Sequence, residues 1–202
     1  MRAVNFQHSD RFQRDYPKTY DWNGGNGADT YSMYGHGGHV SFGRNTDGQD
    51  TKVITLTPEG KVAKFEMNDR CAAGTGRFLE VMAAALSYSM PEFIAAASAA
   101  PNARKLNSMC TVFAESEVIS LIARGEPREN IIAGIHDAIA ARVVAMARRV
   151  GIVEPLMMTG GVAHNIGVVK ALEAKLGYPV QVSAYAQVNG AIGAACLAAA
   201  SF

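Results

Sequence analysis

One stretch of this chain restricts its fold more than any other. Between Pro127 and Gly151, apolar residues recur at spacings of three and four, which is the period of an amphipathic α-helix. A proline at the first position of a helix and a glycine just past the last are both typical. We therefore predict a long helix over residues 127–150. Its apolar face consists of Ile131, Ile135, Ile139, Val143, Met146 and Val150.

Shorter patterns on both sides of this helix alternate between the periods of strands and helices. Turn residues and helix stops separate them, among them the Pro58-Glu59-Gly60 turn and Pro91, which we expect to end a helix. This order predicts an α/β fold with helices packed on a mixed sheet. The other predicted elements are a hairpin of residues 53–56 and 62–67, helices over 78–91 and 111–124, a strand at 156–159, a helix over 165–176, a strand at 180–183 and a helix over 191–200.

The first part of the chain has a different character. Residues 1–44 contain no Leu and no Ile, yet they hold eight of the sixteen aromatic residues and a glycine-rich stretch from Gly24 to Gly43. Without aliphatic periodicity this segment is not expected to form a helix face or an alternating strand. We predict an irregular N-terminal segment, residues 1–44, followed by one folded domain, residues 45–202.

Charge and cysteine content exclude several classes of function. The 19 Lys and Arg residues nearly balance the 18 Asp and Glu residues, and the net charge of +1 provides no basic surface for nucleic acid or for a membrane. Met1 is not followed by a leader pattern, so we expect a cytoplasmic protein. Three cysteines without a CxxC pair do not suggest a disulfide framework, and a site with four cysteines would need a second chain.

Two of the cysteines occupy similar positions. Cys71 lies in a loop hinged by Gly74 and Gly76 directly before a predicted helix, and Cys110 directly precedes the next predicted helix. Unpaired N–H groups and the helix dipole stabilise a thiolate at such a position. Spacing alone leaves two interpretations open, a pair of metal ligands or two buried apolar cysteines, and the second is the commoner situation of a free cysteine.

Two glycine-containing segments are candidates for ligand binding. Gly160 and Gly161 follow a predicted strand, where the missing β-carbons allow a flat ligand to approach the backbone. Gly48, Gln49, Asp50 and Thr51 precede a strand and offer amides and a carboxylate to phosphate and Mg²⁺. Glycines that serve only packing and an ordinary polar entry to a strand would explain the same residues. These patterns by themselves therefore do not distinguish a ligand-binding role from a structural one.

Five segments of the chain form an ordered series of motifs: residues 68–82, residues 110–125, Ile132-Ala133-Gly134-Ile135-His136, residues 158–163 and residues 189–195. They resemble successive motifs of the BadF/BadG/BcrA/BcrD ATPase family, and the resemblance covers residues 45–202. It implies the second domain of an actin-like (acetate kinase, Hsc70 and actin) ATPase fold, whose dimers share one [4Fe-4S] cluster held by two cysteines of each subunit. Those cysteines match Cys71 and Cys110.

The resemblance also implies a nucleotide site. Residues 48–51 match the segment that binds the phosphates of ATP or ADP with Mg²⁺, Gly160 and Gly161 match the adenosine segment, and Gln187 lies in a loop that lines the nucleotide cleft. The chain departs from the family at Asp47, where a glycine is usual. Residues 1–44 also contain no counterpart of the family's N-terminal half domain with its first phosphate loop.

The function implied by the resemblance is ATP-coupled transfer of low-potential electrons from ferredoxin or flavodoxin to an acyl-CoA dehydratase or benzoyl-CoA reductase, by a homodimer or a heterodimer with a paralogous subunit. One alternative is a truncated, non-hydrolysing iron–sulfur relay or binding subunit. Another is a kinase-like relative in which both cysteines are structural. His136 and Glu115 are possible acid/base groups, but both fall within helical patterns, so we expect packing or surface roles for them.

Overall fold

The structure, a computed structural model, describes residues 20–21, 30–31, 38–41, 51–58, 60–68, 75–106, 111–152 and 154–200. Five predicted site residues, Gly48, Gln49, Asp50, Cys71 and Cys110, lie outside these ranges. The elements in chain order are β1 (Tyr20–Asp21), β2 (Thr30–Tyr31), β3 (Gly38–Ser41), β4 (Lys52–Leu56), β5 (Val62–Met67), α2 (Gly76–Ala85), α3 (Met90–Ala99), α4 (Thr111–Ala123), α5 (Arg128–Val150), β6 (Leu156–Thr159), η2 (Gly161–His164), α6 (Ile166–Leu176), β7 (Val180–Val182) and α7 (Asn189–Ala200).

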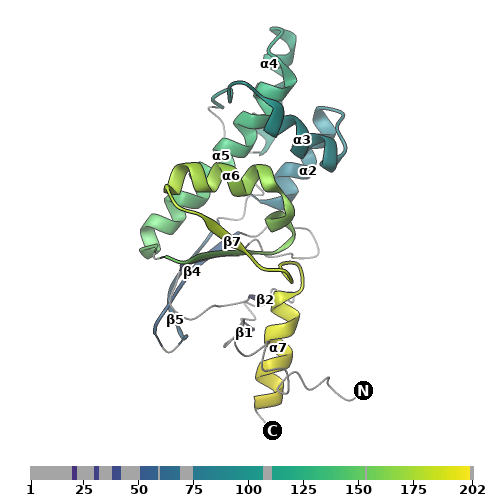
Figure 1. The fold of residues 1–202 in the computed structure, drawn as a ribbon. Coiled ribbons are helices and arrows are strands. Elements are labelled where there is room, and N and C mark those ends of the chain that lie inside the picture. Colours follow the sequence, from purple (N-terminus) through teal and green to yellow (C-terminus); the bar gives the residue numbers. More distant parts are fainter. Residues whose placement is uncertain are drawn as a thin grey trace.

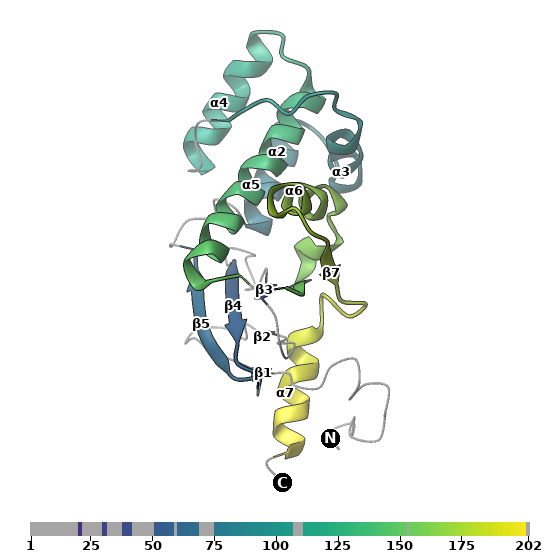
Figure 2. The same ribbon diagram turned by 60° about the vertical axis from the view of Figure 1, so that its left-hand side comes forward.

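A five-stranded sheet in the order β5-β4-β3-β6-β7 forms the centre of the fold (Figure 1). Strands β5, β4 and β3 pair antiparallel, whereas β3, β6 and β7 pair parallel. The sheet is therefore mixed, as predicted. Helices α5 and α6 lie on one side of it, whereas α7 lies beyond the other side and packs against a separate two-stranded sheet of β1 and β2 (Figures 1 and 2).

The middle strand of this sheet comes from the segment that was predicted to be irregular. Strand β3 pairs with β4 through Gly38↔Thr55 and with β6 through Ser41↔Thr159. The prediction for residues 1–44 is wrong at this point, and the boundary at residue 44 falls after a strand of the sheet. A central strand is held by backbone hydrogen bonds to both neighbours, so a short strand needs no aliphatic alternation of its own.

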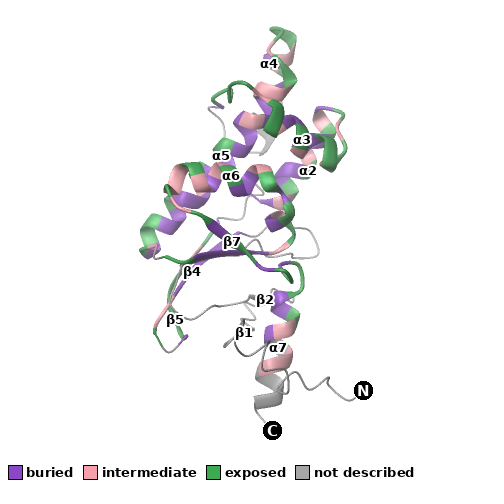
Figure 3. Ribbon diagram, in the orientation of Figure 1, coloured by how far each residue is buried: buried purple, intermediate pink, exposed green. Residues whose placement is uncertain are grey.

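Helix α5 forms the core as its apolar period predicts. All six residues of its predicted apolar face are at most 5% exposed, and the helix ends at Gly151, which has a left-handed φ of 78°. It is the one helix in the described ranges long and apolar enough to cross a membrane, but 67% of its most apolar window is buried inside the fold. This is the behaviour of the central helix of a packed core (Figure 3).

Three shorter helices, α2, α3 and α4, gather around the N-terminal half of α5 (Figures 1 and 2). Pro91 does not end a helix as predicted, because it lies in the first turn of α3. Ser89 and Glu92 form a capping box there, with the Ser89 amide donating to the Glu92 carboxylate at 2.9 Å. The Ser-x-x-Glu spacing in the sequence was the signal for this additional helix.

Candidate functional site

The turn that follows β6 is shaped by its two glycines. Gly160 has a φ of 89°, which favours glycine, and its N–H donates to the Ala186 carbonyl at 2.7 Å. A β-carbon added at Gly161 would meet no atom within 4 Å among the described residues. The backbone at Gly161 therefore faces open space, as the approach of a flat ligand requires.

A second turn lies against the glycine turn. Residues 183–188 connect β7 to α7, and the hydrogen bond from the Gly160 N–H to the Ala186 carbonyl joins the two turns. Gln187 is the next residue and is exposed to solvent. The structure thus brings together Gly160, Gly161 and Gln187, which the sequence predicted to line one cleft.

A buried amide beside this second turn has an unused donor. Asn189, the first residue of α7, is 2% exposed, and its Oδ1 accepts a hydrogen bond from the Ser183 hydroxyl at 2.9 Å. Its Nδ2 has no hydrogen-bond partner among the residues that the structure describes. Buried donors without acceptors are rare in folded proteins. An acceptor on a bound molecule would satisfy this one.

Behind the glycine turn, Asn165 joins the start of α6 to the middle of α5. Its Oδ1 accepts from the amides of Gly167 (3.0 Å) and Val168 (3.2 Å), which caps the helix. Its Nδ2 lies 3.1 Å from His136 Nε2. Since Oδ1 already faces two donors, Nδ2 donates and the imidazole nitrogen accepts.

This contact fixes the state of His136, which is 2% exposed. Its Nδ1 lies 2.8 Å from the carbonyl oxygen of Ile132, which only accepts, so Nδ1 carries the hydrogen. Burial lowers the pKa of His136 below its usual 6.5. A proton on Nε2 would also displace the hydrogen bond from Asn165. The imidazole is a neutral connector within the core, in keeping with the predicted packing role.

The predicted phosphate segment is described only at its last residue, Thr51. The Thr51 amide donates to Asn68 Oδ1 at 2.6 Å, and the Asn68 amide donates to the Thr51 carbonyl at 3.0 Å. The Thr51 N–H therefore already has a hydrogen-bond acceptor within the protein. The pair fixes the end of β5, three residues before Cys71, beside the start of β4. Lys52, the next residue, is only 2% exposed within β4.

Of the two helices that follow the cysteines, α4 begins where the sequence predicts and α2 begins slightly before its predicted start at residue 78. Helix α2 begins at Gly76 and α4 at Thr111, and neither has an acidic residue in its first turn. No carboxylate in these turns competes for the positive ends of the helix dipoles. Within the described residues no group of three metal-ligating side chains occurs, and both predicted ligands, Cys71 and Cys110, lie outside them.

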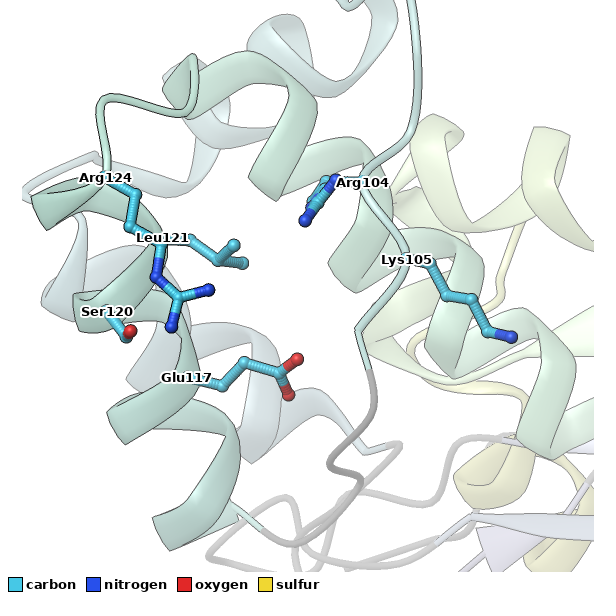
Figure 4. Close-up of a pocket in the computed structure, with 6 residues that line it drawn as sticks. All are labelled: Arg104, Lys105, Glu117, Ser120, Leu121 and Arg124. Atoms are coloured by element: carbon cyan, nitrogen blue, oxygen red, sulfur yellow. The ribbon is translucent and has the colours of Figure 1, made fainter.

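A pocket of about 210 Å³ lies between α4 and the segment that leads from α3 to α4. In Figure 4, Arg124 and Glu117 extend from α4 while Arg104 lies across the opening from them. Arg104 also lies 3.8 Å from the carboxylate of Glu126. The pocket combines cations with a carboxylate, so it is a mixed-charge surface and not a simple anion site. Its lining is Arg104, Lys105, Glu117, Ser120, Leu121 and Arg124.

Sequence analysis did not identify three asparagines that this fold buries. Asn68, Asn165 and Asn189 are each at most 6% exposed. An asparagine in a sequence also suits exposed turns, and only the cap position of Asn165, just before a predicted helix, was a usable signal. Asn68 bonds to Thr51 and Asn165 bonds to His136, and local sequence does not reveal these contacts because the partners lie on other elements.

Comparison with known proteins gives this geometry a context. The sequence model of the BadF/BadG/BcrA/BcrD ATPase family matches residues 46–198. The chain is 50% identical to the (R)-2-hydroxyglutaryl-CoA dehydratase activating ATPase of Acidaminococcus fermentans, over 75% of this chain and 58% of that protein. It is 36% identical to a benzoyl-CoA reductase subunit of Thauera aromatica, over 71% of this chain and 53% of that protein.

A solved structure shows the same fold. The activator of the 2-hydroxyisocaproyl-CoA dehydratase from Clostridium difficile, with bound ADPNP, superposes with a TM-score of 0.76 at 39% identity, over 82% of this chain and 60% of that one. The predicted α/β fold of the actin-like ATPase type is thereby confirmed. The chain spans 58% of the length of the A. fermentans activating ATPase.

Proposed function

This chain belongs to the BadF/BadG/BcrA/BcrD ATPase family, and we propose that it couples an adenine nucleotide to the activation of an acyl-CoA dehydratase or benzoyl-CoA reductase. Its relatives are named as a dehydratase activating ATPase and a benzoyl-CoA reductase subunit. The activation would consist of single low-potential electrons, taken from ferredoxin or flavodoxin and passed to the partner enzyme. We place the protein in the cytoplasm.

The observation that carries the nucleotide part of this proposal is the joined pair of turns. The Gly160 N–H donates to the Ala186 carbonyl, and Gly161 is open on its β-carbon side. The buried Asn189 Nδ2, at the end of the second turn, has no partner among the described residues. A purine offers a flat face to glycine backbone and ring nitrogens to an amide donor. We assign Gly160, Gly161 and Gln187 to the adenosine side, and residues 48–51 to the phosphates and Mg²⁺.

The metal part of the proposal assigns Cys71 and Cys110 as two ligands of a [4Fe-4S] cluster, with the other two from a second subunit. Each cysteine precedes a helix whose first turn has no acidic side chain, which suits negatively charged thiolates. When bound, such a cluster supplies a one-electron couple. The protein's own part is to hold the two thiolates and to connect them to the nucleotide side.

Anaerobic purification tests this proposal directly. We expect brown protein containing iron, sulfide and visible absorbance, and dimers that bind MgADP. Cys71→Ser and Cys110→Ser should each remove the absorbance. The matched control is Cys196→Ser, because Cys196 is a half-buried residue of α7 that matches no ligand. An unchanged spectrum in the Cys71 variant would exclude the assigned ligands.

One observation favours the alternative of a non-hydrolysing relay subunit. The Thr51 amide, which the phosphate segment would otherwise present to the nucleotide, already donates to Asn68. Phosphate binding then relies on the remaining groups of that segment. A phosphate-release assay on the same anaerobic sample separates the two: iron and MgADP binding with no phosphate release would identify the relay, whereas turnover would identify the ATPase.

A further inference from the structure

Helix α5 is in direct contact with two separate parts of the chain within two turns. At Gly134, an added β-carbon would lie 1.8 Å from the Arg104 carbonyl oxygen, so the segment after α3 crosses α5 backbone against backbone. The Arg104 amide also donates to the Asn130 carbonyl at 2.9 Å. Arg104 is six residues before Cys110. This crossing therefore fixes the backbone at Arg104, within the last described residues before Cys110.

The second contact is made by His136, two residues further along α5. A β-carbon at Gly167 would lie 2.8 Å from the imidazole Cδ2 and 3.0 Å from Nε2, so the first turn of α6 rests on the ring. The Phe93 ring of α3 lies on it as well, at 5.3 Å between ring centroids. The contact with Gly167 leaves no room for a side chain between the imidazole and α6.

These contacts form a continuous path. The turn with Gly160 and Gly161 ends at Asn165, Asn165 bonds to His136, and α5 carries the connection back to the crossing at Gly134 and Arg104. The two links between elements are a hydrogen bond between buried side chains and a backbone contact. Energetic coupling between distant sites is carried by contiguous packed and hydrogen-bonded contacts of this kind.

We propose that His136 is a positioning residue that links the glycine turn to the segment at Arg104, and through it to the chain entering Cys110. The inference rests on the proposed function for the identity of the two ends, nucleotide and cluster. The link itself is a property of the described residues and is testable without either ligand.

Three variants distinguish an effect of the hydrogen bond between Asn165 and His136 from a general effect on packing. Asn165→Ser keeps a capping oxygen for α6 but lacks the amide that reaches His136. His136→Leu removes the acceptor, whereas His136→Gln retains a carbonyl that accepts from Asn165. Asp137→Asn is the matched control, because Asp137 is the neighbouring residue on α5 and makes a surface ion pair with Lys175.

The first measurement is amide hydrogen exchange of the full chain, followed by mass spectrometry. We expect Asn165→Ser and His136→Leu to speed exchange of residues 101–106 by about tenfold through local opening. His136→Gln should restore near-normal exchange. The hairpin of residues 52–67 should be unaffected in every variant. If residues 101–106 do not respond, or if His136→Gln behaves like His136→Leu, the link does not exist.

The second measurement adds MgADP. In the unaltered chain, MgADP should slow exchange both in residues 160–165 and in residues 101–106. In Asn165→Ser, protection should persist at the turn and disappear at residues 101–106, a loss of coupling that a purely structural role would not produce. A chain that binds neither MgADP nor iron overturns the proposed function, while the ligand-free exchange result still decides the link.

Discussion

Helices α6 and α4 differ in how completely the chain itself covers them. Helix α6 buries Val168, Val169 and Leu172, each at most 4% exposed. Asn165 caps its start and Gly177 ends it, with a φ of 83°. Apart from Ile166 at its first position, it exposes no large apolar side chain. Apart from Ile166, this chain itself covers the large apolar side chains of α6.

Helix α4, in contrast, keeps large apolar side chains that this chain does not cover. Ala114, Val118 and Leu121 form its buried face, but Phe113 is 66% exposed and Ile119 is 55% exposed. At about 100° per residue, these two side chains flank the buried face on opposite sides. A helix that is apolar around most of its circumference is normally covered. The comparison shows that the apolar face of α6 is covered within one chain, whereas α4 leaves two large apolar side chains exposed, as the proposed second subunit would require.

The largest effect is expected where α5 meets the backbone of the segment after α3. Gly134→Val should cost about 3 kcal/mol or more, because the new side chain occupies the position of the Arg104 carbonyl and the backbone must move. Urea unfolding followed by circular dichroism measures the loss. Ala141→Val, at an exposed position of the same helix, is the control. A Gly134→Val protein as stable as that control would show that the crossing is loose.

A smaller loss is expected from removing the imidazole. His136→Leu should lower the free energy of unfolding by about 2 kcal/mol, because the Asn165 amide is left without its acceptor in a buried site. Asp137→Asn should change it by less than about 1 kcal/mol, since its ion pair with Lys175 is at the surface. An equal loss of unfolding free energy in the two variants would contradict the view that the buried contact between Asn165 and His136 is the stronger of the two contacts between α5 and α6.

Stability should also depend on pH through His136. Burial lowers the pKa of His136 in the folded state, so the unfolded chain binds a proton first as the pH falls. Its contribution to stability is complete above the unfolded pKa of about 6.5 and decreases as the pH falls below that value. Urea unfolding from pH 7.5 to 5 gives the free energy of unfolding of the unaltered chain and of His136→Gln. The difference between these two free energies should therefore become smaller as the pH falls. A difference independent of pH would mean that the imidazole titrates normally.

The smallest effect on stability is expected at α4. Phe113→Ser should change the free energy of unfolding of the monomer by less than about 0.5 kcal/mol, because the side chain is mostly exposed. Association of the chain should nevertheless weaken, which analytical ultracentrifugation measures under anaerobic conditions. Lys170→Ser, at an exposed position of α6, is the matched control. If Phe113→Ser and Lys170→Ser associate alike, Phe113 is not part of the interface.

The sequence was a sound guide wherever structure depends on neighbours along the chain. The period of α5 and its glycine stop, the hairpin of β4 and β5, and the starts of α2 and α4 all follow from local residue patterns. Strand β3 did not, because its pairing with β4 and β6 comes from residues distant in sequence. Helix α3 was missed although Ser89 and Glu92 carried a local signal for it.

Sequence alone also determined the family, since five ordered motifs identify it without any coordinates, and the match to residues 46–198 confirms it. Only the tertiary structure could show that Gly160 bonds to Ala186, that Asn165 reaches His136, and that α5 at Gly134 touches the chain before Cys110. Each of these contacts joins elements that are far apart along the chain. Their partners are chosen by how the helices pack on the sheet, and no local pattern of residues encodes that choice.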